Sequence, residues 1–148
     1  MRDRCSTVLF KLALSPRRVT NSSAAQVGII LDTLGWEFAV FTIALGAMTD
    51  ADATFAVLLE EGNDPALADA APVADVDMVS QTDGVAPETA AAWTFANDNE
   101  IRKIEYIGDK RYIRLTITPT NNNAGSADMG AGCRLGSPQQ ALVTQTQS

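Results

Sequence analysis

The chain has 148 residues, which suits one domain with a hydrophobic core of its own. Its apolar fraction of 46% and charged fraction of 20% are ordinary for a folded protein and exclude a wholly disordered one. No apolar run approaches the about 20 residues of a membrane helix, so we expect no membrane span. Lys11 interrupts the apolar run near the N-terminus, so no export signal is expected either.

Charge is distributed unevenly along the chain, which has a net charge of −7. Residues 1–18 carry +4, residues 19–101 carry −14 without any Lys or Arg, and residues 102–148 carry +3. A segment at −14 would repel itself if it folded alone. We therefore expect both basic ends to pack beside the acidic middle in one domain.

Residues 1–20 form either an N-terminal arm or the first strand of the domain, and the sequence leaves both open. Apolar residues alternate in this segment, as in a strand, and Pro16 ends the pattern. A strand-like arm can attach a protein to its partner through backbone hydrogen bonds. We predict attachment through this segment, with the interface candidates Val8, Phe10, Leu12, Leu14, Arg17 and Arg18.

From Val27 to Leu45 the sequence predicts two β-rich runs that divide near Gly35. The second run is apolar on both faces, which is typical of a central strand covered on both sides. Residues 54–64 predict another strand, and residues 64–91 predict a long loop with one short strand near 76–80.

The segment "IEYIGDKRYIRLTITPT", residues 104–120, alternates apolar and polar residues on both sides of Gly108-Asp109. This pattern predicts a β-hairpin in the middle of a sheet. Residues 120–132 predict a flexible loop, residues 132–136 a short last strand, and residues 139–148 a flexible polar tail.

Short strands at regular spacing predict an all-β fold, an antiparallel β-sandwich with long loops over residues 21–138. Trp36 and Trp93 are expected to anchor its core. A register slip by one residue would turn Tyr112 and Arg114 inward instead. The residues predicted to be buried are Trp36, Phe41, Phe55, Val57, Leu59, Trp93, Ile104, Ile113, Leu115 and Ile117.

The chain contains no histidine, which excludes Ser-His-Asp and Cys-His nucleophiles and the usual zinc sites. Cys5 and Cys133 are expected to be reduced, partly buried thiols, although one bridge between the chain ends is possible.

Carboxylates are the remaining catalytic candidates, either Glu60 with Glu61 or Asp75 with Asp77, because paired acids can hydrolyse glycosides. Asp75, Asp77 and Asp83 are candidates for calcium, but the loop lacks the EF-hand pattern. Acid-rich loops are common on protein surfaces, so we predict no enzyme activity, no metal and no cofactor.

Five basic residues gather around the predicted hairpin, namely Arg102, Lys103, Lys110, Arg111 and Arg114. A nucleic-acid-binding domain usually has a basic excess overall, whereas this chain has a pI of about 4.4. We therefore expect these cations to pair with the acidic middle of the chain.

The segment "IRKIEYIGDKRYIRLTITPT", followed by a Gly/Ala-rich loop, resembles a recurrent small protein of tailed bacteriophages and prophages with an "IGYIGxKRYIRVxxT" element. Those proteins also have an upstream "F-x-L-x-E" strand before an acidic loop, which corresponds here to "FAVLLEEGND". The resemblance covers about residues 36–138 and is most specific over 104–118. The ending differs, because Gln139 and Gln140 stand where the family has basic residues.

The resemblance implies a virion structural protein with a jelly-roll type of β-sandwich. It implies a decoration or cement protein on the capsid exterior, or the base of a head spike. Its implied partners are the major capsid protein, further copies of itself in a trimer or pentamer, and a spike or fibre protein, without nucleic acid or membrane. The alternatives are a tail or head–tail joining component, a small glycosidase, and a carbohydrate-binding module.

Overall fold

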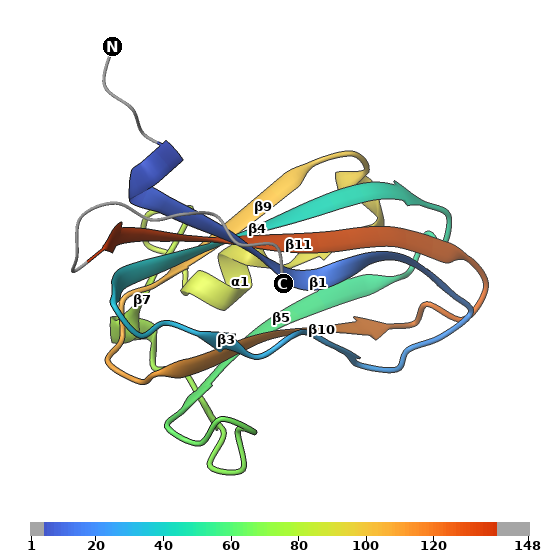
Figure 1. The fold of residues 1–148 in the computed structure, drawn as a ribbon. Helices are drawn as coiled ribbons and strands as arrows, with labels where there is room; N and C mark the ends of the chain where they lie inside the picture. The colour runs from blue at the N-terminus through green and yellow to red at the C-terminus, as the bar shows by residue number, and fades with distance from the viewer. Residues whose placement is uncertain (1–4, 139–148) are drawn as a thin grey trace.

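The computed structural model describes residues 5–138, which form two antiparallel β-sheets packed face to face (Figure 1). The five-stranded sheet contains, in spatial order, β1 (Val8–Thr20), β11 (Ser126–Pro138), β4 (Trp36–Met48), β9 (Ile101–Tyr106) and β7 (Met78–Val79). The six-stranded sheet contains β2 (Gln26–Val27), β3 (Leu31–Asp32), β10 (Tyr112–Thr120), β5 (Thr54–Gly62), β6 (Ala71–Pro72) and β8 (Trp93–Thr94). The helical turns are η1 (Cys5–Thr7), η2 (Asp75–Asp77), α1 (Pro87–Ala91) and η3 (Phe95–Asn97).

The order in which the strands pair defines a jelly roll. β1 pairs with β11, β2 and β3 pair with β10, β4 pairs with β9, and β5 pairs with β6 and β8. The two halves of the chain therefore run side by side as one long antiparallel ribbon, which rolls up so that β11 meets β4 and β10 meets β5. This closure is that of double-sheet jelly rolls, and the expected all-β, jelly-roll-like sandwich is confirmed.

The core lies between the two sheets, and strand alternation fills it from both sides. Of the ten residues predicted to be buried, nine are, and only Trp36 is half exposed. Trp93 stacks on Phe55 with ring centroids 5.1 Å apart, so one of the two tryptophans is a core anchor as expected. In β10 the Ile113 face points inward rather than the Tyr112 face, which settles the register.

The predicted hairpin at Gly108-Asp109 is wrong. β9 belongs to the five-stranded sheet and β10 to the six-stranded sheet, so residues 107–111 cross from one sheet to the other. Ile104 and Ile113 both point into the core, but from opposite sheets. Alternation identifies the buried face of each strand and cannot identify its partner, because pairing is decided by distant segments.

The C-terminal strand was also predicted incorrectly. β11 occupies 126–138 and is one of the longest strands, whereas residues 120–132 were expected to be a loop. Its glycines favoured that interpretation, since glycine weakens isolated strands. In the structure β1 and β4 flank β11 on both sides, and a Cβ on Gly130 would lie 3.0 Å from the Cα of Pro16.

Other parts of the prediction need smaller corrections. β4 is central in its sheet, but only its Phe41 face is buried, while the outer face with Thr42 is not covered. Residues 27–34 contain only the short strands β2 and β3. Cys133 is buried, and Cys5 is exposed rather than partly buried; no disulfide joins them. The tail predicted for residues 139–148 lies outside the described residues.

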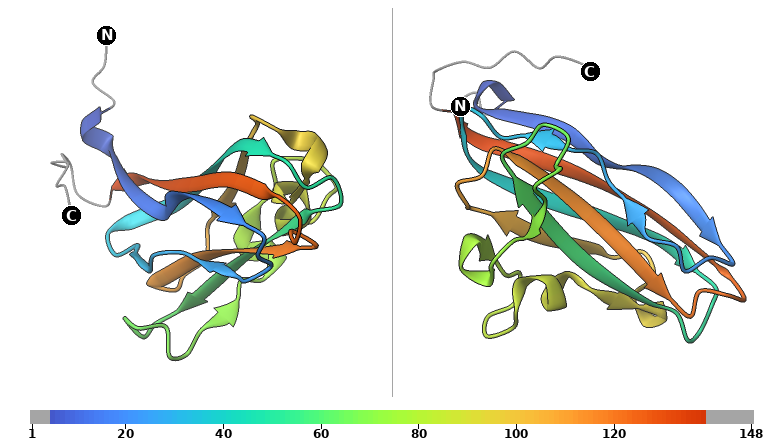
Figure 2. Two further views of the ribbon diagram at one scale, coloured as in Figure 1. Left: turned by 90° about the vertical axis from the view of Figure 1, so that its right-hand side faces the viewer. Right: turned by 90° about the horizontal axis from the view of Figure 1, so that it is seen from below.

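The long connection between β5 and β9 covers one open side of the sandwich (Figure 2). It contains α1, which the sequence did not predict, and which begins with Pro87 in the first turn. The Glu88 carboxylate accepts the Leu59 N–H at 2.6 Å, and Gln81 accepts the Lys103 N–H and donates to the Ala90 carbonyl. No helix in the described residues is long and apolar enough to cross a membrane.

Candidate functional site

The segment 106–111, which the sequence singles out, forms the corner between the two sheets. Tyr106 is buried, and its ring lies over Gly108, where a Cβ would come within 2.6 Å of the ring. Its hydroxyl donates to Glu61 Oε2 at 2.7 Å and accepts the Lys110 N–H at 2.9 Å. Burial, together with the hydrogen bond to Glu61, raises the pKa of the Tyr106 hydroxyl. The corner is therefore held by its own tyrosine.

The basic residues next to this corner are used in ion pairs. Arg111 donates two hydrogen bonds to Asp32, at 3.0 and 2.9 Å, and this contact lowers the pKa of the Asp32 carboxyl. Its guanidinium also lies 5.1 Å from the centre of the Tyr112 ring. These cations were predicted to pair with the acidic middle of the chain, and for Arg111 that prediction is confirmed.

Two further arginines of the cluster follow the same rule. Arg114 contacts Glu60 at 2.9 Å on the neighbouring strand, where Thr116 also donates to the same carboxylate oxygen. Arg102 contacts Glu100 at 2.7 Å. These contacts engage three of the five cations with acids of residues 19–101, whereas Lys110 contacts only its neighbour Asp109, at 3.6 Å, and Lys103 has no ion pair within residues 5–138.

The carboxylates considered for catalysis do not form one site. Glu60 and Glu61 are neighbours in the chain but engage Arg114 and Tyr106 separately. Asp75 and Asp77 lie in η2 on the surface. Within residues 5–138, no group of three or more Asp, Glu, Cys or His side chains is placed to hold a metal ion.

One carboxylate pair was missed by sequence reasoning. Asp50 is 5% exposed and accepts the Ala124 N–H at 2.8 Å, and these backbone hydrogen bonds lower its pKa. Asp52 shares a hydrogen bond with Asp50, and its pKa is raised by that bond and by the Asp50 charge. The pair closes the turn between β4 and β5 against the loop before β11. The Asp-x-Asp spacing is its only sequence signal, and turns often have that spacing.

The predicted interface stripe on β1 is divided between two faces of the sheet. Leu14 is 1% exposed and belongs to the core, whereas Phe10 is 61% and Leu12 49% exposed on the outer face. The register of β1 shifts between Leu12 and Leu14, so a bulge turns the strand over at that point. Val8 is half-buried, Arg17 is exposed, and Arg18 pairs with Asp128 at 2.6 Å.

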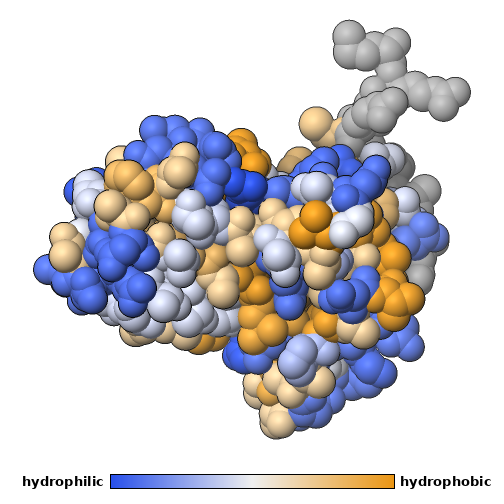
Figure 3. Space-filling model, turned by 180° about the vertical axis from the view of Figure 1, so that it is seen from behind, coloured by the Kyte–Doolittle hydropathy of each residue, from blue (hydrophilic) through white to orange (hydrophobic). Residues whose placement is uncertain are grey.

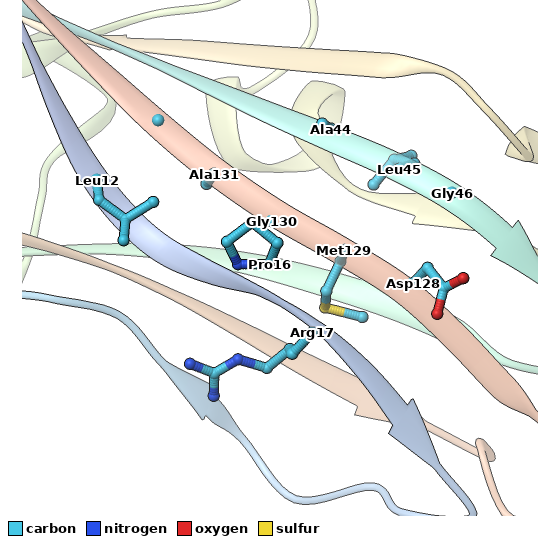
Figure 4. A pocket seen from close by; sticks show the side chains of 11 residues that line it. Leu12, Pro16, Arg17, Ala44, Leu45, Gly46, Asp128, Met129, Gly130 and Ala131 are labelled. Carbon is cyan, nitrogen blue, oxygen red and sulfur yellow. The ribbon is translucent and has the colours of Figure 1, made fainter.

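An apolar groove of about 550 Å³ lies on the outer face of the five-stranded sheet, beside β1 (Figure 4). Leu12 and Pro16 of β1 form one wall, and the backbone of Gly130 and Gly132 in β11 forms part of the floor. Ala44, Leu45, Gly46, Asp128, Met129 and Ala131 complete the lining, and Arg17 stands at the rim. The sequence could not identify the groove, because its floor was expected to be a loop.

Arg17 at the rim of this groove makes hydrogen bonds but no ion pair in the described residues. It donates to the Ser15 carbonyl and to the Gln26 side chain at 3.3 Å, and it has no carboxylate partner in the described part of the chain.

Figure 3 shows the opposite side of the molecule from Figure 1, where hydrophobic residues gather toward the middle between more hydrophilic parts. The molecule therefore has apolar surface in more than one place.

No protein-family model matches the chain, and no curated protein matches it significantly.

Proposed function

We propose that the chain is a non-enzymatic structural protein of a tailed-phage virion. It binds the exterior of the capsid as a decoration or cement protein, or as the base of a head spike. The observation that carries this proposal is the jelly-roll topology, found in a chain whose residues 104–118 resemble a phage structural protein. Jelly rolls are common in viral capsid domains and also in lectins and cupins, so the fold and the resemblance support the proposal together.

The contacts of the corner also support a structural role for the resembling element. The Tyr106 hydroxyl on β9 donates to Glu61 on β5 and so links the two sheets. Gly108 leaves room for the Tyr106 ring, and Arg111 ties the corner to Asp32 in β3. A segment that stabilises the fold in this way is expected to recur among related proteins because the fold requires it, and no substrate is needed to explain the recurrence. The carboxylates considered for hydrolysis are likewise engaged, Glu60 with Arg114 and Glu61 with Tyr106.

The partners follow from the surface. An acidic net charge of −7 suits the outside of a shell whose contents are nucleic acid. The exposed apolar groove suits a protein partner, since a patch rimmed by polar residues is typical of interaction sites. We propose the major capsid protein and further copies of this chain as partners, with a spike or fibre protein as a third.

The test uses the virion encoded together with this chain. Tailless heads and free tails are purified separately, and each is analysed for the chain by mass spectrometry. We expect it on heads, and heads stripped of it should rebind the recombinant protein on their outer surface. Presence on tails alone would favour the tail or head–tail joining alternative, and absence from both would refute the proposal.

A further inference from the structure

The two edges of the five-stranded sheet differ in charge. β1 lies at one edge and β7 at the other, and Figure 2 shows them on opposite sides of the molecule. Residues 5–29, at the β1 edge, contain three basic residues and no acid. Residues 74–101, at the β7 edge, contain six acids and no base. One edge is therefore basic and the other acidic.

The acidic edge carries an exposed apolar knob. Val76 is 80% exposed in the middle of η2, between Asp75 and Asp77. Neither aspartate has a cation partner within residues 5–138. An exposed valine between two unpaired carboxylates contributes nothing to the fold that this structure shows, and it costs hydrophobic surface in water.

The basic edge carries the matching hollow. The groove beside β1 is lined mainly by apolar and glycine residues, and Arg17 stands at its rim without a carboxylate partner in the described chain. Phe10 and Leu12 extend the apolar surface along the same strand. A small branched side chain flanked by two carboxylates is complementary to this hollow in both shape and charge.

We propose that the Asp75–Asp77 turn of one copy docks in the β1 groove of the next copy, with Val76 in the groove and the aspartates beside Arg17. The contact joins two different surfaces, so it is heterologous and builds a closed ring or an open chain of copies. It deepens the proposed function by assigning the interface of the homo-oligomer, and it rests on that part of the proposal only.

The edge strand itself disfavours the simplest alternative contact, which is continuous pairing of β1 with another strand along its whole length. Its register shifts twice, between Leu12 and Leu14 and between Leu14 and Arg17, and Pro16 has no N–H to donate. Bulges and proline are the usual protection of an edge against added strands. The Ala13 carbonyl already accepts the Ile29 N–H. Side-chain docking in the groove therefore fits this edge better than backbone pairing.

The test measures the mass of the full chain by sedimentation velocity over a range of concentrations, without any capsid. We expect wild type at multiples of 15.7 kDa, with weaker association at about 1 M salt, where the Debye length is about 3 Å. Arg17→Glu alone, and Asp75→Lys with Asp77→Lys, should each weaken association at least about tenfold. Glu37→Lys with Asp109→Lys, two exposed acids elsewhere, makes the same charge change as the double aspartate variant and should leave association intact.

Mixing the two weakened variants tests whether the turn of one copy contacts the groove of another. The Arg17→Glu chain keeps an intact turn, and the double aspartate variant keeps an intact groove, so the mixture should associate although neither variant associates alone. Circular dichroism must show that both variants are folded. A wild-type monomer at all concentrations, association that neither variant weakens, or a mixture that stays monomeric would overturn the proposal. None of these outcomes depends on whether the chain binds capsids.

Discussion

The corner at residues 106–111 and the turn at Asp75–Asp77 use charged residues in opposite ways. At the corner, Arg111 meets Asp32 and the Tyr106 hydroxyl meets Glu61, so polar groups are satisfied inside the chain. At the turn, the two aspartates have no cation partner in the described chain, and the valine between them is exposed. Residues satisfied by their own chain stabilise the fold, whereas charges left without a partner are available to another molecule.

The experiment with the largest expected effect tests whether β1 stabilises the fold. Deletion of residues 1–18 removes most of β1, including the buried Ala13 and Leu14, and leaves β11 without one of its neighbours. We expect a chain that is insoluble or unfolded, as judged by circular dichroism and sedimentation. A folded, soluble truncated chain would instead show that β1 acts as a detachable arm.

A second experiment breaks the corner from within. Gly108→Ala places a Cβ within 2.6 Å of the Tyr106 ring, which cannot easily move because its hydroxyl is fixed by Glu61 and Lys110. We expect a loss of about 1–3 kcal/mol in the free energy of unfolding, as for other overpacked sites. Urea denaturation measures it. The control is Asp109→Ala in the same loop. Gly84→Ala is unsuitable as a control, because Gly84 has a φ of +75° and an alanine there would strain the backbone.

How far the sequence predicts these features depends on whether each one is local. Strand faces were predictable, because a period of two identifies inward residues such as Ile113 and Ile117. The crossing between sheets at Gly108 was not, because a hairpin and a crossing have the same alternation. β11 was missed because Gly130 and Gly132 lower strand propensity, while its two neighbouring strands are remote in sequence.

The candidate site shows the same limit. The apolar stripe on β1 was visible in the sequence, but the bulge after Leu12 sends Leu14 into the core and leaves Phe10 and Leu12 outside. Only the structure brings Pro16 next to Gly130 and so forms the groove. The pairing of three cluster arginines with acids of residues 19–101 was predictable, because it follows from charge segregation along the chain, whereas Lys110 contacts its neighbour Asp109 instead.

A third experiment removes the ion pair between Arg114 and Glu60, whose charges are both paired within the chain. Glu60→Gln leaves Arg114, which is only 22% exposed, without its carboxylate partner. We expect a loss of about 1–2 kcal/mol in the free energy of unfolding, because a partly buried charge loses a charge-assisted hydrogen bond. A double-mutant cycle with Arg114→Met isolates the pair. An interaction energy near zero in that cycle would mean that the contact is as weak as exposed pairs.

The Glu88 carboxylate has a hydrogen-bond partner but no cation partner within residues 5–138, and it is partly buried. Burial raises its pKa above the unfolded value, so protonation stabilises the folded chain as pH falls, fully so below the unfolded pKa of about 4.3. Glu88→Gln keeps an acceptor for the Leu59 N–H and removes the charge. It should therefore gain a few tenths of a kcal/mol, and at most about 1 kcal/mol, at neutral pH, since solvent screens this half-buried group.

That gain should disappear at acid pH, where the wild-type carboxyl is neutral as well. Thermal melting at several pH values measures it. The matched variant Glu88→Ala also removes the charge but leaves the Leu59 N–H without this acceptor, so it should be about 1 kcal/mol less stable than Glu88→Gln at every pH. If Gln and Ala behave alike, the hydrogen bond from Glu88 does not hold α1 against β5.

The smallest expected effect on stability belongs to the turn. Asp75→Asn with Asp77→Asn removes two surface charges that have no cation partner in residues 5–138, so the melting temperature of the dilute protein should stay within error of wild type. Any change should be a small rise, since neutralisation reduces the repulsion within an acidic segment. The same variant should weaken self-association, because the Arg17 rim loses its partner. A clear loss of stability in dilute solution would instead place the two aspartates among the residues that hold the fold, and would leave Arg17 without the counter-charge proposed for it.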